Sequence, residues 1–227
     1  MTNRTSQRLF SALHHRFPVY HARVSGTSPP STTFSECGIK EILNAFREGF
    51  MAASPSPDAL PGLAVLEQTP IIIEKIVWSA NDEQLHWKPA ADRWSINEVL
   101  AHLADVEVVG FRERVQLMME KNNPTLVEYD QNAAYAAGKY SGSKARENLK
   151  KFCHERDRTL SALRYVPISV LGRSGQHSNI GRVTIGQLMN EWAFHDLGHI
   201  RQIAELFRSR AFFPAIGPFQ QFYTIKP

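Results

Sequence analysis

The chain has 227 residues, of which 43% are hydrophobic and 21% are charged, and its formal net charge is +4. This length and apolar content are enough to bury one full core, and the sequence lacks the run of about 18 apolar residues that would span a membrane. Residues 1–58 hold six basic and four acidic groups, so each part of the chain carries +2 and neither has the concentrated basic surface of a nucleic-acid-binding protein.

Residues 1–58 are predicted to form an extension to the folded domain. The first 35 residues contain four arginines, a pair of prolines and no acidic group. This composition is typical of a largely disordered tail and also of an organellar transit peptide, and Met51 offers an alternative start. Residues 36–53 have the pattern of a short amphipathic helix, and residues 54–57 are interpreted as a linker. The folded domain is therefore expected to span residues 59–227.

From residue 59 onward apolar residues recur at helical spacing, without the alternation that marks strands, which predicts an all-α fold of four helices. The first helix is expected over residues 60–80, broken or bent near Pro70, because proline removes a backbone donor and Thr69 can cap a new start. The second begins at Ile96, where Ser95 and Glu98 form a capping box. Its inner face is expected to comprise Ile96, Val99, His102, Leu103, Val106, Val109 and Val115.

The third helix is expected over residues 143–165, with its apolar residues buried and its charged residues in water. The apolar set is Leu149, Phe152, Leu160 and Leu163. A connection of about 20 residues precedes this helix, long enough for a crossover and for an extra helical turn over residues 130–140. The fourth helix follows Thr184, which forms a second capping box with Gln187. The aromatic tail over residues 212–223 is expected to pack on the bundle or on a second copy of the chain.

Two histidines of the fourth helix give the strongest functional signal. His195 and His199 are one helical turn apart on its apolar stripe, so both imidazoles face the core and can bind one metal ion. His102 lies on the inner face of the second helix. A rise of about 1.5 Å per residue brings the three rings to one level only if the second and fourth helices are antiparallel. A lone inward histidine is more often a hydrogen-bonded core residue, but the three together favour a metal centre with an open position.

Other motifs are weaker. The spacing of His195 and His199 is similar to that in H-E-x-x-H metalloproteases, but Asp196 stands where those enzymes need a general-base glutamate. The remaining histidines and the cysteine of the folded part are interpreted as surface or core residues: His86, His154, His177 and Cys153. Three polar residues either orient a ligand or bound water or lie at the surface: Asp105, Glu191 and Gln202.

Two sequence blocks carry a resemblance to a known family: Arg93-Trp-Ser-Ile-Asn-Glu-Val-Leu-Ala-His102-Leu-Ala-Asp and His195-Asp-Leu-Gly-His199-Ile-Arg-Gln202. In this order and on helices, they resemble the DinB-like, or YfiT-like, metal-binding four-helix bundles over residues 60–208. The resemblance implies a long crossover between helices two and three and antiparallel pairing of helices two and four. It also implies a divalent-metal site, often nickel or zinc, formed by His102, His195 and His199. Known members include thiol-dependent transferases and isomerases, and metal-dependent hydrolysis is proposed for others.

The sequence therefore predicts a divalent-metal-dependent enzyme that activates water or a thiol for hydrolysis or thiol transfer on a small molecule. The alternative is a non-catalytic bundle that binds a metal, a small ligand or a partner. A low-molecular-weight thiol is the expected co-substrate, a homodimer is left open, and no nucleic-acid or membrane partner is expected. The two cysteines form no close-spaced pair, which favours a reducing, cytoplasmic compartment. Three imidazoles suit zinc, nickel, iron or copper, so the ligands alone leave the metal open.

Overall fold

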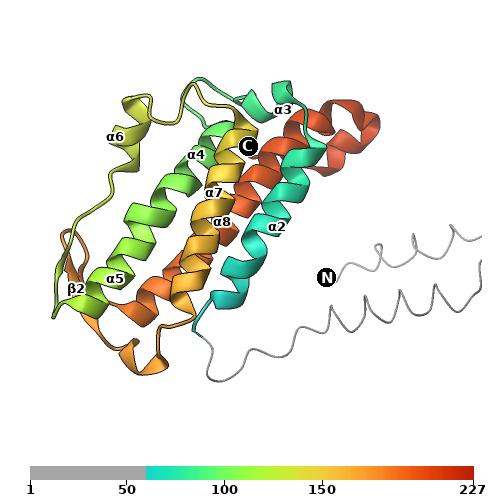
Figure 1. Cartoon of the computed structure of the whole chain (residues 1–227). Coiled ribbons are helices and arrows are strands. Elements are labelled where there is room, and N and C mark those ends of the chain that lie inside the picture. The colour runs from blue at the N-terminus through green and yellow to red at the C-terminus, as the bar shows by residue number, and fades with distance from the viewer. Residues whose placement is uncertain (1–59) are drawn as a thin grey trace, which may run out of the picture. The chain divides into compact units, whose positions relative to one another are not determined.

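The computed structural model describes residues 60–227, so the expectations for residues 1–58 lie outside the described residues. Four long helical segments lie side by side in a bundle (Figure 1). They are α2 (Leu63–Ser79), a second segment that begins with α4 (Ile96–Val106), α7 (Ala145–Leu163) and α8 (Ile185–Ala211). The predicted all-α four-helix bundle is confirmed. Within residues 60–227, no helix has the length and apolar character needed to cross a membrane.

The order of the helices includes the predicted crossover. After the short α3 (Asp82–His86), the second segment runs from α4 through a π-helix, η1 (Glu107–Arg112), into α5 (Glu113–Glu120). α2 and α8 run in one direction along the bundle, and the second segment and α7 run in the other (Figure 1). The connection from α5 back to the start of α7 contains α6 (Gln131–Ala136), at the expected extra turn. α4 and α8 are therefore antiparallel, as the three-histidine hypothesis requires.

Side-chain caps fix the start of both helices that carry the histidines. The Ser95 hydroxyl accepts the Glu98 amide at 3.3 Å, and the Glu98 carboxylate accepts the Ser95 amide at 2.8 Å. Thr184 and Gln187 exchange the same pair of bonds at the start of α8. These boxes satisfy amides that have no acceptor within the helix, so the two predicted helix starts are confirmed.

Of the break or bend predicted near Pro70, the break is wrong, because α2 is continuous through this residue. Thr69 does not cap a new start, since its hydroxyl donates to the Val65 carbonyl at 2.8 Å inside the same helix. Pro70 has no N–H for the Leu66 carbonyl, which would otherwise be left without its helical donor. Arg156 of α7 supplies that donor, with Nη1 at 2.8 Å from the Leu66 oxygen. A side chain from another helix thus compensates for the proline.

Because of the π-helix η1, one residue of the predicted inner face does not lie inside. Val109 was expected inside, but 36% of its surface is exposed. A π-turn accommodates one residue more than an α-turn, so inward positions after it shift by one residue. Phe111, five residues after Val106, is the side chain that lies inside, with 3% exposed. Gly110 permits this winding, since a Cβ there would lie 2.3 Å from the Val106 side chain.

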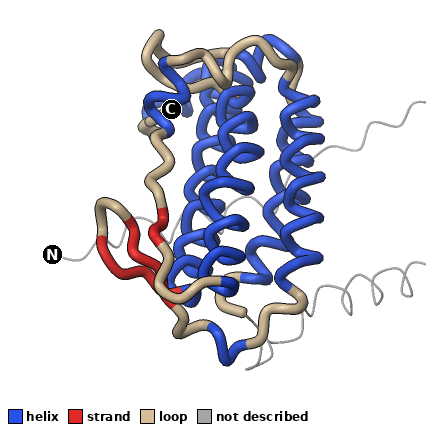
Figure 2. Tube along the Cα trace, turned by 60° about the vertical axis from the view of Figure 1, so that its left-hand side comes forward, coloured by secondary structure: helices blue, strands red, loops and turns tan. Residues whose placement is uncertain are grey.

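A small sheet that the sequence did not predict lies beside the bundle (Figure 2). It comprises β1 (Thr125–Leu126), β2 (Ser174–His177) and β3 (Gly181–Thr184) in that order. β1 pairs parallel to β2, with Thr125 opposite Gln176, and β2 pairs antiparallel to β3. The strands are too short to show a period of two, which is why the pattern gave no signal. The sheet connects the crossover segment to the start of α8.

α7 and the C-terminal tail differ in part from expectation. Arg156 of α7 is only 1% exposed, so the prediction that all charges of this helix face water is wrong. Leu149, Phe152 and Leu163 are buried as predicted, whereas Leu160 is half-buried.

A 3-10 turn over Ile168–Val170 follows α7. After α8, the C-terminal part of the chain forms two more 3-10 turns, Phe213–Ala215 and Gly217–Phe222. It returns to the bundle, where Arg93 donates to the Pro227 carbonyl at 2.6 Å and the Lys226 amide donates to Glu205 at 2.8 Å. Four aromatic side chains of the tail are more than half exposed: Phe212, Phe219, Phe222 and Tyr223. These bonds join residues 226 and 227 to the bundle, whereas packing of the aromatic residues over 212–223, on the bundle or on a second copy, stays a prediction.

Candidate metal centre

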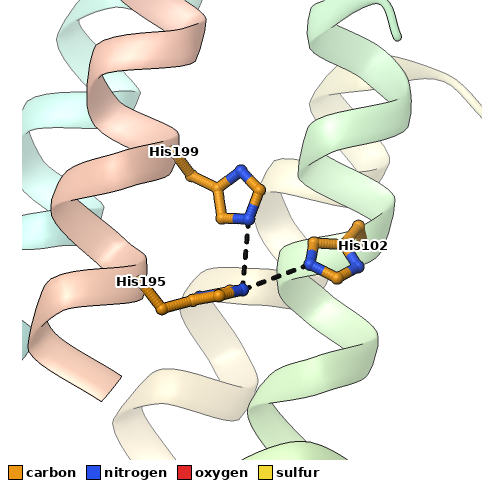
Figure 3. A group of neighbouring side chains, drawn as sticks. All are labelled: His102, His195 and His199. Atoms are coloured by element: carbon orange, nitrogen blue, oxygen red, sulfur yellow. Dashed lines mark hydrogen bonds between the residues drawn. The ribbon is translucent and has the colours of Figure 1, made fainter. Parts of the chain in front are cut away.

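His102 of α4 and His195 and His199 of α8 point toward one another across the bundle (Figure 3). The Nε2 atom of His195 lies 3.3 Å from Nε2 of His102 and 3.1 Å from Nε2 of His199. One ligand atom from each ring can be chosen so that all lie within 4.8 Å of one another. The structure thus brings together the three histidines that the sequence singled out.

The ring of His102 is held from behind by residues of the crossover segment. Its Nδ1 lies 3.4 Å from the Tyr140 hydroxyl, which lies 2.5 Å from the Tyr129 hydroxyl. Tyr129 donates to the carboxylate of Asp105, which also binds Lys139 at 2.6 Å. The Asp105 carboxylate can only accept, so Tyr129 donates to Asp105 and Tyr140 donates to Tyr129. The Tyr140 oxygen is then left to accept from His102. This direction places the proton of His102 on Nδ1 and leaves the Nε2 lone pair facing the other two rings.

His199 is oriented in the same way by its own helix. Its Nδ1 lies 2.8 Å from Oε1 of Gln202, an amide oxygen that can only accept. The proton of His199 is therefore on Nδ1, and its Nε2 lone pair faces His195. Nδ1 of His195 is buried and has no hydrogen-bond partner among residues 60–227. Edge-on contact with Phe111, at 5.3 Å between ring centroids, packs the His195 ring instead.

Burial keeps the three imidazoles neutral. Removal from water, together with the neighbouring histidines, lowers the pKa of His102 to about 3 and that of His195 to about 2. Burial also lowers the pKa of His199, against the opposing effect of its bond to Gln202. Only the neutral imidazole has a free lone pair for a metal ion. The group is therefore in its metal-binding form at neutral pH.

The spacing of the nitrogens fits a shared ion. Two nitrogens bound at about 2.05 Å to one ion, with a tetrahedral angle between them, lie about 3.3 Å apart. Nε2 of His195 lies at 3.3 Å and 3.1 Å from Nε2 of the other two rings, and ligand atoms of all three rings lie within 4.8 Å of one another. Without an ion, the single N–H of His195 could serve only one of the two Nε2 lone pairs that face it, and the other would stay buried without a partner, which is unfavourable. The residues present fit a divalent metal held by three imidazoles.

These pKa shifts predict that the metal-free protein loses stability as the pH falls. Below about 6.5, the ordinary histidine pKa, the unfolded chain takes up protons on these rings. The folded chain does so only near pH 3 for His102 and pH 2 for His195. Between these limits, proton uptake by the unfolded chain at each ring lowers the free energy of unfolding by up to about 1.4 kcal/mol for each pH unit that the pH falls.

Urea unfolding of metal-free protein between pH 7 and pH 4 measures this slope. His102→Gln is expected to have a slope that is shallower by about one proton. His154→Gln, at an exposed position of α7, is the matched control and should keep the wild-type slope. Equal slopes for wild type and His102→Gln would show that His102 is not held neutral by the fold.

A buried charge network lies next to the histidines. Arg156 donates to both oxygens of Glu107 at 2.8 Å, and to Asp196 at 2.6 Å and 3.1 Å. All three residues are 1% exposed. Trp192 also donates to Glu107, at 3.2 Å, and stacks on Phe111. Asp196, which the sequence analysis considered only as a poor substitute for a catalytic glutamate, is thus a structural residue that joins α8 to α7 and η1.

Two cavities reach the three-histidine group. The first, of about 550 Å³, is lined by His102, His195, Phe111 and Tyr129, and by His177 of β2. His177 was interpreted as a surface residue, but it is half-buried, and the unpredicted sheet brings it to this cavity. The second cavity, of about 730 Å³, is lined by His195, His199 and the last residues of the chain, Thr224, Lys226 and Pro227. Glu191 lines both cavities.

The remaining predicted residues are placed as follows. Gln202 orients the His199 ring and lines the second cavity, and Asp105 acts on the His102 ring only through Tyr129 and Tyr140. His154 is exposed, and His86 lies at the end of α3 with Nδ1 2.7 Å from the Asp82 carbonyl. Half-buried Cys153 packs against the core, as predicted. Sequence reasoning missed four residues around the site. Tyr129 and Tyr140 lie in a segment without a helical stripe, and Arg114 and Arg156 have the spacing of ordinary charges on a helix surface.

Comparison with known proteins identifies relatives. The model of the DinB superfamily matches residues 66–203. A protein of Oceanobacillus iheyensis named "Putative metal-dependent hydrolase OB0782" is 25% identical over 142 residues, covering 62% of this chain and 81% of that protein. The structure of YfiT from Bacillus subtilis, described as a probable metal-dependent hydrolase with an unusual four-helix bundle topology, matches with a TM-score of 0.60. That match has 20% identity and covers 81% of this chain and 94% of YfiT.

Proposed function

Because this chain belongs to the DinB superfamily, we propose that it is a metal-dependent enzyme in which His102, His195 and His199 hold one divalent ion through Nε2. Nickel and zinc are the metals we propose. The observation that carries the proposal is the convergence of three Nε2 atoms, with separations of 3.3 Å and 3.1 Å from His195. The names of the two relatives, which refer to metal-dependent hydrolases, give independent support.

When bound, such an ion lowers the pKa of a water or thiol ligand and so supplies a nucleophile near neutral pH. The residues of this chain supply the rest. Tyr140 and Gln202 fix the tautomer and direction of two rings, and Phe111 packs the third. The cavity of about 550 Å³ beside His102 and His195 has the volume to admit a small molecule. No fourth His, Cys, Asp or Glu of residues 60–227 joins the group, which leaves room for an exchangeable ligand.

Hydrolysis of a small molecule is the reaction that we propose first, since it needs only water at the open position. Transfer of a low-molecular-weight thiol to an electrophile is the second reaction, and a non-catalytic binding bundle is the alternative. We propose a cytoplasmic location and treat residues 1–58 as an extension to the domain; a homodimer stays a prediction.

Elemental analysis of the purified, tag-free full-length chain tests the proposal. We expect about one divalent metal per chain, removed by a chelator and restored by zinc or nickel. Titration of the nickel-loaded protein with cysteine then separates the two reactions, because a thiol bound to nickel gives a sulfur-to-metal absorption band. The absence of bound metal, and failure to take it up, would overturn the proposed function.

A further inference from the structure

The first cavity contains charged residues that the three-histidine site does not use. Around it lie Arg114 of α5, Glu128 of the crossover segment, Arg182 of β3 and Glu191 of α8. Its apolar wall consists of Val106, Phe111, Leu126, Ile180, Val183 and Leu188. A cavity of about 550 Å³ with this lining suits an organic molecule that has both an apolar part and a charged group.

Arg114 is the partly buried cation of this cavity, whereas Arg182 is exposed. Its Nη2 donates to the Val127 carbonyl at 2.7 Å, while its Nε is buried and has no partner among residues 60–227. No carboxylate of these residues lies within ion-pair distance of it, whereas Arg112, two residues earlier, pairs with Glu155 at 2.7 Å. Burial lowers the pKa of Arg114. A partly buried guanidinium without an anion is unfavourable, so the free cavity favours binding of one.

The other charged groups do not cancel this preference. Glu128 is exposed and accepts from the side chain of Asn179, and Arg182 is exposed and donates to Ser174 at 3.1 Å. Glu191 has no ion pair within residues 60–227; burial raises its pKa, against the opposing effect of Arg114. Glu191 and Glu128 both attract Arg114, but each acts at longer range than an ion pair.

We propose that this cavity binds a small organic carboxylate, with its carboxylate on Arg114 and its apolar part against Phe111 and Leu188. The inference rests on the proposed function, because it takes the cavity beside His102 and His195 to be the substrate site. A carboxylate matches the planar donor groups of a guanidinium, and such a charge-assisted bond is about twice as strong as a neutral one. Arg114 selects the substrate class, and the three histidines lie at the position where the substrate reacts.

Isothermal titration of the full-length chain with benzoate tests the proposal, with benzyl alcohol as the neutral counterpart and inorganic phosphate as the competing anion. The titrations are run on zinc-loaded and on metal-free protein, because benzoate can also bind zinc directly. We expect saturable benzoate binding in both forms, and a loss of about 10- to 100-fold in affinity for Arg114→Gln. Benzyl alcohol should bind the variant and wild type alike. Arg182→Gln, in the same cavity, is the matched control and should change benzoate affinity by less than about threefold.

The outcomes separate this inference from the proposed function. Unchanged benzoate affinity in Arg114→Gln, equal losses in both arginine variants, or binding of phosphate without benzoate would each overturn it. Thermal unfolding and zinc content of Arg114→Gln should match wild type, so that a folding defect is recognised. If the protein takes up no zinc but still binds benzoate in a way that depends on Arg114, the carboxylate site would stand and the proposed metal-dependent function would be wrong.

Discussion

Replacing Arg156 with methionine is expected to lower the free energy of unfolding by about 3–5 kcal/mol. The change leaves the carboxylates of Glu107 and Asp196 buried without their cation, and it also removes the donor of the Leu66 carbonyl. Burial alone would lower the pKa of Arg156, but the bonds and charges of Glu107 and then Asp196 raise it above its ordinary value. Denaturant unfolding followed by circular dichroism measures the effect.

Two further variants show whether charge pairing is the cause. Arg158→Met, on the same helix but 60% exposed, should cost less than about 1 kcal/mol. Combining Arg156→Met with Glu107→Gln and Asp196→Asn removes the unpaired charges and is expected to recover part of the lost stability. A loss below about 1 kcal/mol in Arg156→Met would contradict the view that this network holds α7, α8 and η1 together.

Removing any one of the three histidines is expected to weaken zinc binding by at least about 1,000-fold. Each of His102→Ala, His195→Ala and His199→Ala deletes one of three protein donors, and with it a large part of the binding free energy. Competition with a chromophoric chelator measures the affinity. His154→Ala, at an exposed position, should bind zinc like wild type. A histidine variant with unchanged zinc affinity would remove that residue from the site.

Tyr140→Phe provides a graded comparison within the same assay. The variant keeps the ring beside Trp94 and His102 but deletes the hydroxyl that lies 3.4 Å from His102 Nδ1. Loss of such an orienting bond typically costs about 10- to 100-fold in metal affinity. Zinc affinity equal to wild type would show that the Tyr140 hydroxyl does not orient His102.

The sequence alone was sufficient to identify the three histidines, because the patterns that place them on inward helix faces are local. Capping boxes fix where α4 and α8 begin, and helical spacing then puts His102, His195 and His199 on inward faces. The relative direction of α4 and α8 could not be predicted from residue spacing alone. The resemblance supplied the antiparallel pairing of α4 and α8 that the depth of the three residues required.

The residues that sequence reasoning missed depend on contacts between distant segments. Arg156 has the spacing of a surface charge, and only Glu107, Asp196 and the proline-freed Leu66 carbonyl make its burial favourable. The π-turn that exposes Val109 has no sequence pattern that distinguishes it from an α-helix. Tyr129 and Tyr140 lie in the crossover segment, whose path past His102 is set by the bundle rather than by local preference.

The central claim is that one divalent ion lies among the three Nε2 atoms, and anomalous diffraction from crystals of the zinc-loaded protein tests it most directly. We predict one peak at the zinc edge, about 2.0–2.1 Å from Nε2 of His102, His195 and His199. A peak at another site, or no peak together with direct hydrogen bonds between the imidazoles, would contradict the claim.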